Sequence, residues 1–240
     1  MTDGQTSKWN GAGFAVACGA LILLFSLGIR HGFGLFLQPI SLEQGWGSET
    51  FAFSIALQNP VWGISQPFVG MLADRFGAKQ IIVLGALVYA VGLWAMSQVA
   101  GEVVFILGAG VLIGLGLAGT TFPVIFGAIS RLVRPEQRSM AMGITMSVGS
   151  FGQFALVPMT LGLIGFLDWD GALMAPLAFG ITRIDVAASP AAPDTSTVRE
   201  ALSGAFGSRD FWLLSLGFLP AAFRWSLSQS ICLRFLRVRA

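Results

Sequence analysis

Two adjacent residues, Arg30 and His31, are the side chains of this sequence best placed to do chemistry, because both lie well inside a long apolar run. An ionised group is costly in such a run, so it usually faces a water-filled cavity or a ligand pathway. A guanidinium can hold a carboxylate through paired charge-assisted hydrogen bonds. If Arg30 faces a cavity, it suits the carboxylate of a small organic anion.

The positions of these two residues leave other interpretations open. Arg30 lies in the outer half of its run, where an arginine can also extend its charged group to the lipid head groups. His31 projects about 100° away from Arg30 around a helix, and it suits a packed, neutral histidine as well as a proton carrier. Three polar residues in other apolar runs complete the candidate substrate-binding set, although each could equally form a hydrogen bond between helices: Gln58, Asn59 and Gln153.

The remaining residues do not form an enzyme, metal or cofactor site. The chain has one histidine, and its carboxylates fall between the apolar runs, so no catalytic or metal-ligand group can be assembled. Its two cysteines, Cys18 and Cys232, have no metal or disulfide spacing. The segment GLGLAG (114–119) matches the dinucleotide fingerprint GxGxxG, but no strand precedes it. We therefore expect no catalytic residue, metal or cofactor, and we interpret these glycines as helix-packing positions.

The elements that carry the candidate residues are long apolar runs. Hydrophobic residues make up 55% of the 240 residues and charged residues 11%, about half the usual charged share of a soluble protein. The net charge of +2 gives no reason to expect a nucleic-acid partner. A helix of roughly 20 apolar residues crosses a bilayer, and helices satisfy the backbone within lipid. The sequence therefore predicts an all-α membrane protein in a lipid bilayer, with spans at about 13–37, 50–73, 80–99, 103–129, 139–166 and 171–182.

Lysine and arginine predict the orientation of these spans, because short cytoplasmic loops retain positive charge. They occur in every second connection: they are present in 74–79, in 130–138 and from 183 onward, and absent from 38–49 and from the turns at Glu102 and Asp168. The alternation predicts a multi-pass protein of the cell (inner) membrane with a cytoplasmic N-terminus. No small-residue cleavage site follows the first run, so we expect an uncleaved first helix.

The C-terminal part of the chain departs from this pattern. The run 171–181 is short for a crossing, which predicts a shortened sixth helix. We expect a helical bundle over 1–182, a cytoplasmic linker over 183–210 and an incomplete seventh helix with a basic tail over 211–240. The tail is either an interfacial basic helix or the product of a change of coding frame near Leu219. We favour the second interpretation, in which the chain is truncated within the seventh helix.

The connection between the second and third runs carries the most specific pattern. The segment GMLADRFGAKQ (70–80) could be a simple polar turn in which Asp74 caps the next helix and Gly77 adopts a left-handed backbone. As a whole it resembles the signature loop of the major facilitator superfamily. The stretches GIRHGFGLFLQPIS (28–41) and RPEQRSMAMGITMSVGSFGQF (134–154) resemble the bacterial branch related to monocarboxylate carriers and oxalate–formate antiporters. The loop residues that match the signature are Gly70, Asp74, Arg75, Gly77 and Lys79.

The resemblance implies a twelve-helix carrier built from two six-helix halves, each made of two inverted three-helix repeats, with the substrate bound between the halves. It implies that this chain is the N-terminal half of a secondary transporter for small, monocarboxylate-like anions. The signature loop would gate transport, with Asp74 facing a helix of the second half and stabilising the outward-facing state. That helix lies outside this sequence, which leaves the gating role open. A missing C-terminal half or a homodimer could complete the cavity.

Other classes of function remain open at this stage. A non-transporting membrane protein could act as a structural or regulatory partner through its glycine-rich helices. A membrane enzyme ranks third, because no catalytic group can be assembled. None of the predicted spans contains Asp or Glu, so proton coupling has no obvious carboxylate here.

Overall fold

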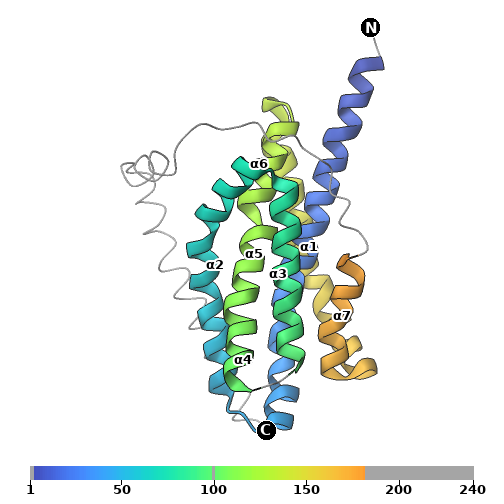
Figure 1. Ribbon diagram of the computed structural model, residues 1–240. Coiled ribbons are helices and arrows are strands. Elements are labelled where there is room, and N and C mark those ends of the chain that lie inside the picture. Colours follow the sequence, from blue (N-terminus) through green and yellow to red (C-terminus); the bar gives the residue numbers. More distant parts are fainter. Residues whose placement is uncertain (1–2, 99–100, 182–240) are drawn as a thin grey trace. The chain divides into compact units, whose positions relative to one another are not determined.

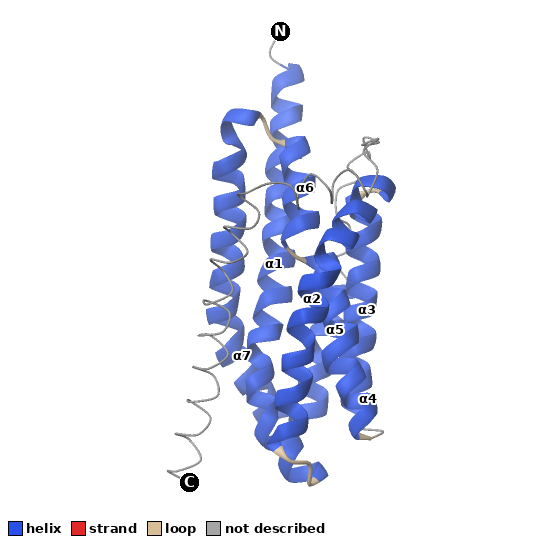
Figure 2. Cartoon of the chain, turned by 90° about the vertical axis from the view of Figure 1, so that its left-hand side faces the viewer, coloured by secondary structure: helices blue, strands red, loops and turns tan. Residues whose placement is uncertain are grey.

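A computed structural model describes residues 3–98 and 101–181, and it describes side chains for 12–98 and 101–175. The chain divides into two units, Met1–Pro193 and Asp194–Ala240. The predicted linker (183–210) and tail (211–240) lie outside the described residues. Throughout the described part the secondary structure is helical and contains no strand (Figure 2). The predicted all-α fold is therefore confirmed.

The described helices form a bundle joined by short connections (Figure 1). The first three are α1 (Asp3–Gln44), α2 (Ser48–Phe76) and α3 (Ala78–Gln98). A broken helix then comprises α4 (Glu102–Ile106), the π-helical segment η1 (Leu107–Leu112), α5 (Ile113–Thr120) and α6 (Phe122–Leu132). The 3₁₀ turn η2 (Pro135–Gln137) leads into α7 (Arg138–Ile181).

Four helical stretches of the described part are long and apolar enough to cross a membrane: Ala12–Gln44, Ala78–Gln98, Glu102–Leu132 and Pro135–Ala175. Helix α2, expected as a span at 50–73, is not among them. Its 29 residues extend about 43 Å at the helical rise, so its length is sufficient. Polar residues lower its hydropathy, and one of them, Gln58, is fully buried in the bundle.

Several helix ends differ from the sequence prediction. Helix α1 continues past 37 to Gln44 and contains Pro39. This proline is tolerated because it lies near the C-terminal end, where a missing backbone N–H removes little of the helical hydrogen bonding. The connection to α2 is consequently short, and Gly45 there has a positive φ of 66°. Helix α7 contains both the fifth and sixth predicted spans. Asp168 (φ 60°, ψ 175°) interrupts its helical backbone between them.

Glycines bring α5 into backbone contact with α2 and α3. A Cβ placed on Gly116 would lie 2.7 Å from the backbone nitrogen of Tyr89 in α3, and one on Gly119 would lie 2.9 Å from the Cα of Gly85. On the α2 side, a Cβ on Gly114 would lie 3.0 Å from a backbone oxygen. The GxGxxG glycines are therefore packing positions, as the sequence indicated, and helix α5 is buried between its two neighbours.

The two ends of the bundle carry opposite charge. At the acidic end, Thr50 donates a hydrogen bond to Glu102, and the Trp169 indole donates one to Glu43. The basic end contains the connections between α2 and α3 and between α6 and α7. Its basic residues are Arg75, Lys79, Arg131, Arg134 and Arg138.

Candidate functional site around Arg30

The guanidinium of Arg30 is held between α1 and α2. Its Nη2 donates a hydrogen bond to the Oδ1 of Asn59. The Asn59 Nδ2 donates to the backbone oxygen of Ile55, one turn earlier, at 3.0 Å, which aims the amide oxygen at Arg30. The Arg30 Cζ lies 5.0 Å from the centroid of the Trp62 ring, within the range of a cation–π interaction. Two predicted site residues, Arg30 and Asn59, are thus in direct contact.

Trp62 extends this contact to the break between α5 and α6. It follows Asn59 by three residues, so both side chains lie on one face of α2. Its Nε1 donates to the Thr121 Oγ1 at 3.1 Å, and that hydroxyl donates to the Leu117 backbone oxygen at 2.6 Å. Thr121 is fully buried and has an extended backbone (φ −120°, ψ −156°), so it ends α5. Three helical stretches therefore fix the position of the indole under Arg30.

The charge of Arg30 has no acidic partner within the described residues. Both groups that hold it, the Asn59 amide and the Trp62 ring, are neutral. The ion pair found in the described part lies elsewhere, between Arg131 and Asp74. Arginine stays protonated in proteins, and an uncompensated charge among apolar helices is unfavourable. The arrangement can therefore bind an anion, and it repels a cation.

Gln58 lies one residue before Asn59 and is fully buried. Neither its Nε2 nor its Oε1 has a hydrogen-bond partner, and the same holds for the buried hydroxyl of Tyr89 and the Nε of Arg30. Gln58 is therefore a buried polar side chain of α2 without a hydrogen-bond partner among the described residues.

The other two candidate substrate-binding residues are placed differently. The Nδ1 of His31 contacts the Leu27 backbone oxygen of its own helix at 3.1 Å. Gln153 is half-buried in α7, and no hydrogen bond joins it to another described residue. Both remain predictions as substrate contacts. Among the described residues, no cluster of His, Cys, Asp or Glu could hold a metal ion.

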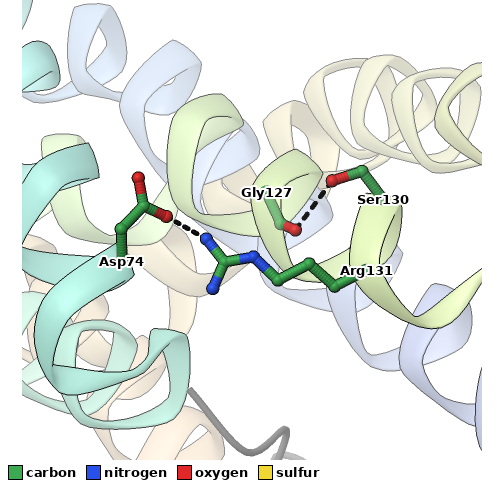
Figure 3. A network of polar contacts seen from close by, with 4 residues as sticks. All are labelled: Asp74, Gly127, Ser130 and Arg131. Atoms are coloured by element: carbon green, nitrogen blue, oxygen red, sulfur yellow. Dashed lines mark hydrogen bonds and ion pairs between the residues drawn. The ribbon is translucent and has the colours of Figure 1, made fainter. Parts of the chain in front are cut away.

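The signature loop forms a polar contact at the basic end. Arg131 of α6 extends toward α2 and pairs with Asp74, while Ser130 donates to the Gly127 backbone oxygen at 2.9 Å (Figure 3). Gly77, which separates α2 from α3, has a positive φ of 99° that favours glycine. The Asp74 carboxylate is thus directed to Arg131.

The other signature residues lie around this pair. Arg75 and Lys79 are exposed, with the Arg75 Cζ 5.5 Å from the centroid of the Phe76 ring. A Cβ on Gly70 would lie 3.6 Å from Pro123 of α6, an ordinary packing distance. The loop therefore contacts α6 at two points.

Comparison with known proteins identifies the family. The family profile described as Major Facilitator Superfamily matches residues 12–236. The chain belongs to the Major Facilitator Superfamily. It is 32% identical over 170 residues to the multidrug resistance protein MdtH of Yersinia enterocolitica, covering 66% of this chain and 41% of that protein. It is 24% identical over 217 residues to mouse monocarboxylate transporter 11, covering 86% of this chain and 48% of that protein. The chain thus spans about half the length of these relatives.

Membership of the Major Facilitator Superfamily confirms the fold expected from the signature loop, and it makes the chain a multi-pass membrane protein. The structure adds three residues that sequence reasoning did not place in a site. Trp62 could have been found from its three-residue spacing to Asn59. Thr121 stood out as a polar residue within an apolar run, but its partner Trp62 on α2 could not be read from the sequence. Arg131 gave no such signal, because its partner Asp74 also lies on α2, distant in sequence.

Proposed function

We propose that this chain is the N-terminal half of a secondary transporter that moves small organic anions across the cell (inner) membrane by alternating access. The observation that carries the proposal is the charge of Arg30, which two neutral groups hold in place and no described carboxylate neutralises. The cost of such a charge falls when an anion binds beside it. Membership of the superfamily supports transport as the use of that site.

A carboxylate is the anion that fits best. Arginine donates in a planar fork that matches the two oxygens of a carboxylate. Asn59 and Trp62 restrict the rotation of the guanidinium, so the fork is oriented before the ligand arrives. The likeness to monocarboxylate transporter 11 supports a monocarboxylate-like substrate.

The charges at the two ends of the bundle support an orientation with the N-terminus in the cytoplasm. Arg75, Lys79 and Arg131 lie at the same end, which the positive-inside rule assigns to the cytoplasm together with the N-terminus. A second set of helices would complete the substrate cavity. Relatives about twice as long as the aligned region support a C-terminal half as that partner, and a second copy of this chain is the alternative.

A second candidate is the export of amphiphilic drugs, which the likeness to the multidrug resistance protein MdtH supports. A row of aromatic rings favours it: the Trp62 centroid lies 6.4 Å from that of Phe122, and Phe122 lies 5.7 Å from Phe126. The positive charge of Arg30 beside this row disfavours cationic drugs.

Ligand-induced stabilisation of the purified full chain in detergent tests the anion site. Sodium formate, acetate and pyruvate are expected to raise the melting temperature saturably, whereas sodium chloride at equal ionic strength is not. Arg30→Ala should weaken carboxylate binding about 10- to 100-fold, since a hydrogen bond to a charged group contributes about 1.5–3 kcal/mol. Arg131→Ala, which changes an arginine at the basic end, is the matched control and should retain binding.

Unchanged carboxylate affinity in Arg30→Ala would remove the anion site. Stabilisation by the neutral drug chloramphenicol but not by carboxylates would favour the drug-export candidate. Liposomes that contain the chain alone should take up little labelled acetate, because half of the cavity is missing. Robust uptake would contradict the proposal that this chain is half of a carrier. It would not contradict the proposal that Arg30 binds an anion.

A further inference from the structure

A row of three aromatic rings begins at the charge of Arg30. The Arg30 Cζ lies 5.0 Å from the centroid of the Trp62 ring. That centroid lies 6.4 Å from the Phe122 ring, which lies 5.7 Å from the Phe126 ring. Phe122 and Phe126 are four residues apart, so they share one face of α6. The aromatic row therefore runs from the arginine along α6, toward the basic end of the bundle.

The rings of the aromatic row keep part of their surface exposed. Trp62, Phe122 and Phe126 are half-buried, and each packs only partly against an apolar cluster. The contact between Phe51 and Phe105 at the acidic end differs from them. These two rings lie 5.9 Å apart, but they are 7% and 1% exposed and belong to the packed core. The aromatic row, unlike that pair, offers ring surface to a ligand.

The guanidinium and the aromatic row can bind different parts of one molecule. Asn59 accepts one hydrogen bond from the five N–H donors of Arg30, so other donors of the fork are left for a carboxylate. Aromatic side chains attract a further ring in offset or edge-on contact, with centroids about 4.5–7 Å apart. A carboxylate joined to an aryl group by a short linker satisfies both features. A small aliphatic acid satisfies only the first.

We propose that the Arg30 site prefers aryl-substituted monocarboxylates, with the carboxylate on the guanidinium and the aryl ring against the aromatic row. This specificity rests on the proposed anion site. Phe122 and Phe126 are its specificity-determining residues, because they contact the ring of the ligand and not its charge. Trp62 serves both parts of the ligand, since its ring lies under Arg30 and beside Phe122.

Equilibrium dialysis of the full chain in detergent tests the preference with two labelled ligands that differ by one phenyl group. Propionate presents only the carboxylate, and 3-phenylpropionate adds the ring. We expect 3-phenylpropionate to bind about 10-fold more tightly, because ring burial and aromatic contact add to the charge interaction. The saturated analogue 3-cyclohexylpropionate should bind with an affinity between those of the other two, since it has no aromatic ring.

Variants of the aromatic row locate the ring of the ligand. Phe126→Leu keeps an apolar side chain but removes the aromatic ring, so the preference for 3-phenylpropionate over propionate should fall several-fold. Phe122→Leu should lower the preference in the same way. Phe154→Leu, at a 78% exposed position of α7, is the matched control and should keep the full preference. Arg30→Ala should weaken the binding of both acids, because it removes the group that they share.

The ligands also separate this specificity from the anion site on which it rests. Equal affinities for propionate and 3-phenylpropionate would overturn the aryl preference without contradicting the anion site. Binding of neither acid would contradict the anion site, and the aryl preference with it. If benzyl alcohol bound as tightly as 3-phenylpropionate, the aromatic row would bind rings without Arg30, which also contradicts the proposal.

Discussion

Arg131, near the end of α6, pairs with Asp74, near the end of α2, and so joins the signature loop to another helix of the same bundle (Figure 3). The family resemblance assigns to this aspartate a role in latching the two halves together. In this structure its carboxylate already has a partner within the chain. A latch to a second half would therefore have to share Asp74 with Arg131 or displace it.

This pair should make a small, salt-dependent contribution to stability. The two side chains are 30% and 43% exposed, and exposed ion pairs contribute about 0.2–1 kcal/mol. A double-mutant cycle with Asp74→Asn and Arg131→Gln, followed by unfolding in detergent, should give a coupling energy in that range that declines at high salt. Arg134→Gln, at an exposed arginine of the same connection, should show no coupling to Asp74→Asn. A coupling energy of zero at low salt would contradict the pairing.

The contact between α5 and α3 should be intolerant of a single methyl group. Gly116→Ala places a Cβ 2.7 Å from the Tyr89 backbone, which cannot move without shifting α3. We expect a loss of about 1–3 kcal/mol, as for other overpacked sites, measured by thermal unfolding in detergent.

Gly63→Ala is the control for this variant. A Cβ at Gly63 meets no atom within 4 Å, and alanine is favoured over glycine inside a helix. Stability should be unchanged or slightly raised. Equal losses of stability in the two variants would show that replacing a helical glycine is itself destabilising. The close contact between α5 and α3 would then not be the cause.

Asp168 should be a position where glycine is preferred. Its φ of 60° and ψ of 175° lie in a region that is essentially restricted to glycine, and a side chain there costs about 1–3 kcal/mol. Asp168→Gly should therefore raise the melting temperature. Asp170→Gly, two residues later within the helical part of α7, should lower it. A lower melting temperature for Asp168→Gly would refute strain at this turn.

The sequence predicted the helices well because lipid imposes a simple rule: a crossing helix needs a long apolar run. Charges between the runs located the turns, and the signature loop indicated the family. Helix α2 was expected in spite of its polar residues, and the structure shows a helix there whose Gln58 is buried.

The side-chain contacts were harder to predict because they join residues that are distant in sequence. Arg30 and Asn59 were both candidates, but nothing in their spacing showed that they would meet across two helices. The break at Thr121 and the π-helical segment Leu107–Leu112 fall inside one continuous apolar run. Such departures from α-helical geometry depend on packing against α2 and α3, which hydropathy does not record.

The glycine contacts of α5 also determine how this chain can move. Helices whose backbones touch at Gly85, Gly114, Gly116 and Gly119 cannot slide along one another without steric overlap. We therefore expect helices α2, α3 and α5 to move together as one rigid unit when the protein changes conformation. The two irregular stretches of the broken helix, Leu107–Leu112 and Thr121, lie at the two ends of α5, so we expect any bending of the broken helix to occur there.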